Sequence, residues 1–253
     1  MSAYFESLNR RARTSGAGNA APAPAPAARP VRPVERSAPA PTPTPVLPPT
    51  STTLAHRYLA LRERLLVAAN GRPLRVIVFA GCEGGEGSRE ITRDFSETLA
   101  QSGLKVMMLD AGIGRESVAS PNDVTQLVAR DGTAASATCG KGQLTVVAGP
   151  AGTADKEHFY RSAEFASWLD RQRGVYDYAL IDAPPIARFA DATLLGRLCD
   201  GVVIVIEAGA THRDVLVRGR EQLERSDVKV IGAVLNRVRD ELPAALRPYF
   251  GEE

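Results

Sequence analysis

The chain has 253 residues, of which 44% are hydrophobic and 24% charged, and its formal net charge at pH 7 is +2. Such values are typical of a soluble globular domain with an additional tail. The small net charge and scattered basic residues argue against a nucleic-acid-binding protein, and no apolar run reaches the ~20 residues that a membrane-spanning helix needs.

Three cysteines, Cys82, Cys139 and Cys199, lie far apart in the sequence. An odd number without regular spacing indicates a reducing compartment and no disulfide framework. The first residues contain no apolar stretch of the kind found in signal peptides, so we expect a cytoplasmic protein. Cys82 lies in a glycine-rich loop, where a small filler residue is favoured over a reactive thiol.

The first 53 residues divide into two predicted segments. Residues 1–14 fit a short helix with Tyr4, Phe5 and Leu8 on one face, which would suit docking to a partner or a membrane surface; a frayed terminus is favoured. Residues 15–53 consist mainly of alanine, proline, serine and threonine. This composition predicts a disordered, extended linker.

The folded domain is expected to cover residues 54–253. It opens with an amphipathic pattern over 54–69, in which Leu54, Tyr58, Leu61 and Leu65 form one apolar stripe. We expect a helix that packs on the core, with a subunit contact in a homo-oligomer as the alternative. Asn70-Gly71 would end this helix.

A strand, a glycine-rich loop and a helix follow at residues 75–90, RVIVFAGCEGGEGSRE. This order is typical of a phosphate-binding loop, because the loop N–H groups and the helix N-terminus both favour an anion. The usual motif reads G-x-x-x-x-G-K-[ST]. When the pattern is anchored on Gly87, the next two residues are Ser88 and Arg89, so both the lysine and the magnesium-binding hydroxyl are missing.

Apolar strands alternate with helices from residue 74 onward. Strands are predicted at 74–80, 105–110, 144–148, 178–182, 202–207 and 228–235, and helices at 88–102, 123–129, 156–171, 190–199 and 213–225. This alternation predicts an α/β fold with a doubly wound, mostly parallel sheet. Ligands bind such sheets beyond the carboxyl ends of the strands, and Asp110, Asp182 and the glycine loop all lie at such ends.

Taken together, these segments resemble the bacterial (BY-type) tyrosine kinases of capsule and exopolysaccharide synthesis, the CpsD/CapB family, within the MinD/ParA-like deviant P-loop ATPases. The resemblance covers about residues 54–238 and is most specific in YDYALIDAPPI (176–186), DGVVIVIE (200–207) and IGAVLNRV (231–238). It implies that Asp110 and Asp182 are catalytic, that Asp182 binds Mg²⁺, and that Asn236 and Arg237 lie at the adenine.

The resemblance also assigns the cofactor-binding loop, which comprises Gly84, Gly85, Glu86, Gly87, Ser88 and Arg89. Ser88 stands where the family has lysine, and this loss would weaken ATP or ADP binding by about 10–100-fold. Arg89 lies one residue further on, ~100° around the helix, and is a poor substitute. Ser88 is expected to cap the helix with its hydroxyl.

Three functions follow from these patterns. The favoured one is a degenerate family member that acts as a scaffold or regulator, with little or no ATP turnover, beside a membrane polysaccharide chain-length regulator. The second is an active protein-tyrosine autokinase that uses ATP and Mg²⁺. The third is a partition-type positioning ATPase, against which Glu83 argues, because that group carries an extra lysine at this position.

Overall fold

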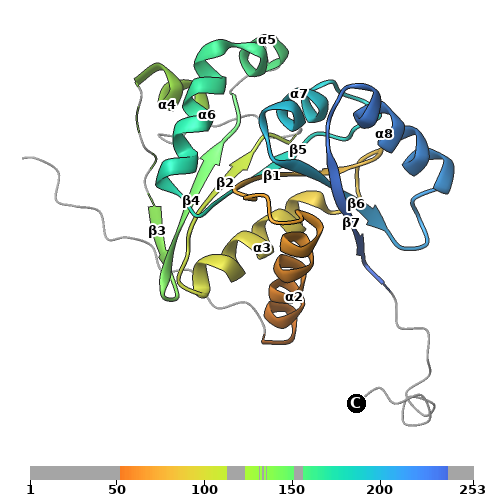
Figure 1. Cartoon of the computed structure of the whole chain (residues 1–253), viewed down its shortest axis with the longest axis horizontal. Helices are drawn as coiled ribbons and strands as arrows, with labels where there is room; N and C mark the ends of the chain where they lie inside the picture. The colour runs from red at the N-terminus through yellow and green to blue at the C-terminus, as the bar shows by residue number, and fades with distance from the viewer. Residues whose placement is uncertain are drawn as a thin grey trace, which may run out of the picture. The chain divides into compact units, whose positions relative to one another are not determined.

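The computed structural model describes residues 52–112, 123–130, 132, 134, 136–150 and 156–238. These residues form a seven-stranded sheet with the order β3-β4-β2-β5-β1-β6-β7 (Figure 1). The strands are β1 (Val76–Gly81), β2 (Lys105–Asp110), β3 (Ser136–Cys139), β4 (Gly142–Ala148), β5 (Tyr178–Ala183), β6 (Gly201–Glu207) and β7 (Val230–Asn236). Neighbouring strands are parallel except for β3 and β4. The predicted mostly parallel α/β sheet is therefore confirmed.

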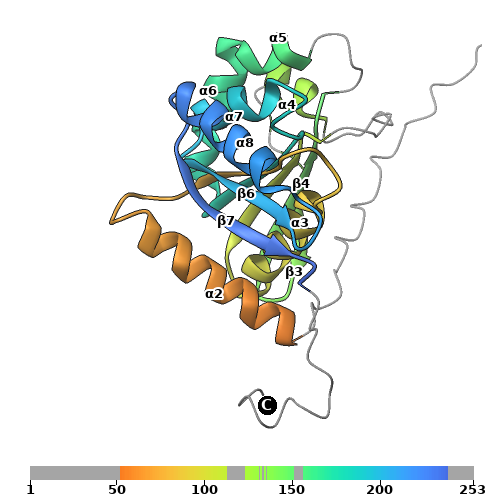
Figure 2. The ribbon, with the colours of Figure 1, turned by 90° about the vertical axis from the view of Figure 1, so that its right-hand side faces the viewer.

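Helices cover both faces of the sheet (Figures 1 and 2). They are α2 (Thr52–Ala68), α3 (Ser88–Gln101), α4 (Val124–Arg130), α5 (Lys156–Arg161), α6 (Ala163–Val175), α7 (Asp191–Leu198) and α8 (Arg213–Arg225). Side chains of α2 and α3 contribute to one hydrophobic cluster, and side chains of α4 to α8 contribute to the other. The sheet is thus the middle layer of three, as the doubly wound prediction requires.

Strand β1 lies near the middle of the sheet and is buried at all six positions. Its side chains alternate between the faces: Val76 and Val78 belong to the cluster beneath α4–α8, and Ile77 and Phe79 to the cluster beneath α2 and α3. Burial on both faces explains why this strand is a continuous apolar run. The glycine loop at its carboxyl end is therefore attached to one of the most buried elements.

Helix α2 packs on the core through the predicted stripe. Tyr58 and Leu65 are buried, and the Tyr58 ring lies 5.9 Å from the ring of Phe95 in α3. Nε of Arg62 donates a hydrogen bond of 3.3 Å to the hydroxyl of Tyr178 in β5. Core packing is confirmed for this face, whereas a subunit contact through the outer face remains a prediction. The helix begins at Thr52, inside the predicted linker.

One predicted helix is wrong, and one observed strand was not predicted. The single helix predicted at 156–171 is divided into α5 and α6, because Ser162 is extended and its Oγ accepts a hydrogen bond of 3.1 Å from the N–H of Phe165. Strand β3 was not predicted at all, and it forms a hairpin with β4. The predicted docking helix at 1–14 and nearly all of the linker lie outside the described residues.

Candidate functional site

The glycine loop connects β1 to α3 and runs beside the segment that follows β5. The N–H groups of Ile186 and Ala187 donate to the carbonyl oxygens of Gly81 (3.0 Å) and Cys82 (2.9 Å). Within the loop, Gly84, Gly85 and Gly87 have φ values of 108°, 97° and 80°. Other residues rarely adopt these values, so the glycines shape the loop through their backbone.

The carboxylate of Glu86 occupies two N–H groups of its own loop. Its oxygens accept hydrogen bonds from the N–H groups of Glu83 (2.7 Å) and Gly84 (2.8 Å), and the residue is only 5% exposed. A side chain at position 81 would overlap Oε2 of Glu86, so Gly81 leaves the space that this carboxylate fills. Glu86 therefore acts as an internal anion that holds the first half of the loop.

Cys82 is the first loop residue after β1 and is fully buried. Burial, with a smaller contribution from the nearby Glu86 carboxylate, raises the pKa of its thiol to about 11. Thiolate is the reactive form of cysteine, and such a pKa leaves little of it at neutral pH. These observations favour the predicted filler role.

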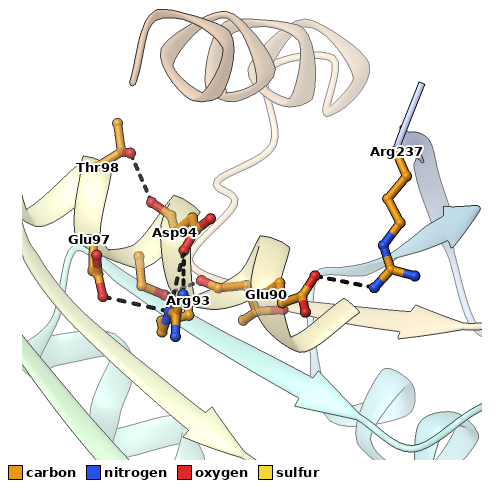
Figure 3. Close-up of polar contacts among 8 residues, drawn as sticks. Glu90, Arg93, Asp94, Glu97, Thr98 and Arg237 are labelled. Carbon is orange, nitrogen blue, oxygen red and sulfur yellow. Dashed lines mark hydrogen bonds and ion pairs between the residues drawn. The ribbon is translucent and has the colours of Figure 1, made fainter. Parts of the chain in front are cut away.

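The last residue of β7 and the residue after it hold the second half of the loop. Nδ2 of Asn236 donates to the carbonyl oxygen of Glu86 (2.9 Å), and Nη1 of Arg237 donates to that of Gly85 (2.8 Å). Arg237 also pairs with Glu207 at 3.2 Å and with Glu90 at 3.4 Å, the latter drawn in Figure 3. Both residues thus fix the loop, and the expected contact with adenine remains a prediction.

The structure places Ser88 differently from the prediction that its hydroxyl caps α3. Gly87 is the N-cap residue and Ser88 is the first residue of the helix. The Ser88 hydroxyl donates a hydrogen bond of 2.7 Å to Oδ1 of Asp182 at the end of β5. The cap prediction is wrong because Gly87, in the left-handed conformation, already begins the helix. This leaves the serine side chain facing the aspartate.

The two predicted catalytic aspartates lie side by side. Asp110 and Asp182 are partners in the register of the parallel strands β2 and β5. A side chain at position 112 would lie 2.8 Å from Oδ2 of Asp182 and 3.5 Å from Oδ1 of Asp110, so both carboxylates border Gly112. Nη2 of Arg89 lies 2.5 Å from Oδ2 of Asp110. The sequence did not predict this ion pair. Because of it, the guanidinium group of Arg89 already has a carboxylate partner.

Asp182 is 3% exposed, and burial is the main reason why its pKa is raised to about 7. The hydrogen bond from Ser88 opposes this shift, the negative charge of Asp110 adds to it, and Arg89 again opposes it. A buried carboxylate without a strong cationic partner is costly to ionise. The acid at the centre of the site thus titrates near neutral pH when no cation is bound.

These groups line a cavity of about 1010 Å³. Six carboxylate residues and four arginines contribute to its wall, together with the glycines of the loop. Among the described residues, no group of three or more histidine, cysteine, aspartate or glutamate side chains is arranged to hold a metal. Asp182 and the Ser88 hydroxyl nevertheless offer oxygen ligands, and Mg²⁺ commonly uses one or two carboxylates with waters and phosphate oxygens. The donor set therefore fits a magnesium ion that arrives with a phosphate ligand.

None of the helices in the described part of the chain is long and apolar enough to cross a membrane.

The sequence of the chain is similar to those of a bacterial tyrosine-protein kinase and a polysaccharide biosynthesis transport protein. No family model matches the chain. Over 187 residues it is 26% identical to the tyrosine-protein kinase CpsD of Streptococcus agalactiae, covering 70% of this chain and 81% of the relative. It is 30% identical over 184 residues to the succinoglycan biosynthesis transport protein ExoP of Rhizobium meliloti, covering 66% of this chain but 23% of that longer protein.

Solved structures show the same fold. The kinase domain of Escherichia coli tyrosine kinase ETK superposes with a TM-score of 0.66 at 21% identity, covering 75% of this chain and 78% of that one. A chain of the MinC:MinD cell division protein complex from Aquifex aeolicus gives a TM-score of 0.52 at 20% identity, covering 69% of this chain and 72% of that one. The resemblance to bacterial tyrosine kinases with a MinD-like fold is confirmed, and the chain is similar to the tyrosine-kinase component of capsule and exopolysaccharide synthesis.

Proposed function

We propose that the chain is a regulatory or scaffolding component of a capsule or exopolysaccharide machine, which binds Mg·ADP or Mg·ATP weakly and transfers phosphate slowly or not at all. The observation that carries this proposal is the Ser88–Asp182 hydrogen bond. A neutral hydroxyl faces the buried aspartate at the position where the family motif has a lysine. The first turn of α3 therefore brings no unpaired cation to the phosphate site.

The chemistry of phosphoryl transfer explains why this loss matters. Catalysis consists largely of positioning the phosphates and stabilising their charge. A charge-assisted hydrogen bond contributes ~1.5–3 kcal/mol, so its absence lowers nucleotide affinity by about 10–100-fold. Six carboxylate residues in the cavity wall would further oppose a polyphosphate. Binding would then rely on the loop N–H groups that the Glu86 carboxylate does not occupy, the N-terminus of α3 and a magnesium ion.

Individual residues would have distinct roles. Asp182 and Ser88 would bind the Mg²⁺ or its waters, and the ion would neutralise phosphate charge. Glu86, Asn236 and Arg237 would keep the loop in its shape before the nucleotide arrives. Asp110, which is paired with Arg89, would be less available as a base than an unpaired carboxylate.

The partner in this proposal is a membrane chain-length regulator whose cytoplasmic tail docks on the folded domain, which would recruit the protein to the inner face of the membrane. Residues 1–14 and 15–53 would serve as a docking segment and a linker. The resemblance to CpsD-type kinases supports this arrangement. An active autokinase is the second candidate, and the adjacent aspartates favour it.

Titration calorimetry with Mg·ADP and Mg·ATP tests the proposal. We expect dissociation constants of about 10 µM or weaker, together with little transfer of label from ATP to protein. The Asp182→Ala variant is the control, because it should remove any label that comes from this site. Submicromolar binding with sustained turnover that Asp182→Ala abolishes would refute the proposal and establish the kinase.

A further inference from the structure

Four arginines line the cavity: Arg89, Arg93, Arg188 and Arg237. Three of them are paired with carboxylates, namely Arg89 with Asp110, Arg93 with Asp94 and Glu97, and Arg237 with Glu90 and Glu207. Figure 3 shows the pairs made by Arg93 and Arg237 along α3. The guanidinium group of Arg188 has no ion pair or hydrogen bond with any residue that the structure describes.

Arg188 is held close to the glycine loop by its own backbone. It comes directly after Ile186 and Ala187, which are hydrogen-bonded to the loop residues Gly81 and Cys82. One turn earlier, the ring of Pro185 lies so close that a side chain on Gly84 would approach it to 3.1 Å. The N–H of Arg188 donates to the carbonyl of Pro185 at 3.1 Å, which continues this turn. The side chain is exposed and borders the same cavity as Ser88 and Asp182.

We propose that Arg188 is the residue that contacts the phosphates of a bound nucleoside di- or triphosphate, in place of the lysine that Ser88 replaces. This inference rests on the proposed nucleotide site. Among the described residues the guanidinium of Arg188 has no ion pair to give up when an anion arrives, whereas Arg89 would have to leave Asp110, from which it lies 2.5 Å away. The positively charged guanidinium of Arg188 would form charge-assisted hydrogen bonds with the phosphate oxygens.

The test measures binding of Mg·ADP and of inorganic pyrophosphate to the full chain by calorimetry. Arg188→Gln removes the charge and Arg188→Lys keeps it. Arg72→Gln is the matched control, because Arg72 is also exposed and lies before β1, at the end of that strand opposite the loop. We expect Arg188→Gln to weaken both ligands about tenfold or more, Arg188→Lys to recover most of the loss, and Arg72→Gln to have no effect.

The outcomes separate this inference from the function on which it rests. If the wild-type chain binds Mg·ADP and Arg188→Gln binds it equally well, the nucleotide site stands and the role of Arg188 is refuted. If Arg188→Lys is as weak as Arg188→Gln, the positive charge is not what the site requires, and the role is again refuted. If the wild-type chain binds neither ligand at millimolar concentration, both proposals fail.

Discussion

The hydroxyl of Ser88 and Oδ1 of Asp182 are 2.7 Å apart, although the two residues are separated by 94 positions in the sequence. This hydrogen bond joins the first residue of α3 to the end of β5 in the wall of the cavity. A hydroxyl only moderates the cost of ionising the buried acid, whereas an ammonium group would compensate its charge. The side chain at position 88 therefore bears directly on the ionisation of Asp182.

Replacing Ser88 by lysine should strengthen nucleotide binding. The new ammonium group would stand beside Asp182 and face the phosphate site, so we expect the Ser88→Lys variant to bind Mg·ADP about 10–100-fold more tightly than the wild type. Calorimetric titration measures the change. Ser88→Ala is the control, because it removes the hydroxyl without adding charge. Equal affinities for the lysine and alanine variants would contradict the assignment of this position.

Asp182 should make stability depend on pH. Its pKa is about 7 in the folded state and about 3.9 in an unfolded chain. Between about pH 4 and pH 7 the unfolded chain releases this proton and the folded chain keeps it, so the free energy of unfolding falls as the pH rises. The loss amounts to at most about 4 kcal/mol and is complete above about pH 7.

The Asp182→Asn variant, which cannot titrate, should lack this component. Urea denaturation without magnesium or nucleotide should show the variant gaining stability relative to the wild type between pH 4.5 and pH 8. The amide oxygen can still accept the Ser88 hydrogen bond, so the comparison isolates the charge. A constant difference between the two proteins at both pH values would argue against the raised pKa.

Glu86 offers a test of the loop without any ligand. The Glu86→Gln variant keeps the size of the side chain but removes the charge that two loop N–H groups contact. We expect a loss of about 1–3 kcal/mol in the free energy of unfolding, with faster amide hydrogen exchange at Glu83 and Gly84. The control is Glu83→Gln, since Glu83 is exposed. Unchanged exchange in the Glu86 variant would show that its carboxylate does not hold the loop.

Asp200 makes a comparable set of contacts at the opposite end of the sheet. Its carboxylate accepts hydrogen bonds from the N–H groups of Arg75 (2.7 Å) and Val76 (2.8 Å) and pairs with Arg173 at 2.6 Å. The Asp200→Asn variant should be destabilised by about 1.5–3 kcal/mol in chemical denaturation. Asp170, whose side chain is 82% exposed and which contacts the same arginine at 3.4 Å, is the matched control. Its asparagine variant should differ from the wild type by no more than about 0.5 kcal/mol.

The buried strands are predictable from the sequence, and so is the end of the sheet at which their carboxyl ends lie. Continuous apolar runs identified β1, β2 and β5, and parallel pairing then brings Asp110, Asp182 and the glycine loop to one edge. Strand β3 was missed because its four residues, Ser-Ala-Thr-Cys, contain no apolar run. The signal that could have revealed it is Gly140-Lys141, a two-residue connection with φ of 59° at the glycine, which is typical of a hairpin.

Side-chain partners at the site could not be predicted in the same way. Sequence spacing predicts that Arg89 lies one position beyond the lysine of the motif, but it could not predict the pairing of Arg89 with Asp110, because that depends on how α3 lies against β2. The two bonds accepted by Glu86 likewise depend on the loop conformation and on the space left by Gly81. Arg188 belongs to none of the sequence motifs described above. Its position beside the glycine loop is known only from the structure.

Strand β7 forms one edge of the sheet, and its neighbour along the sheet is β6. The two residues at its carboxyl end, Asn236 and Arg237, hold successive carbonyl groups of the glycine loop. A displacement of this edge strand along β6 would pull on the loop directly through these two side chains. Force applied where the chain leaves the sheet would thus reach the glycine loop through the side chains of Asn236 and Arg237.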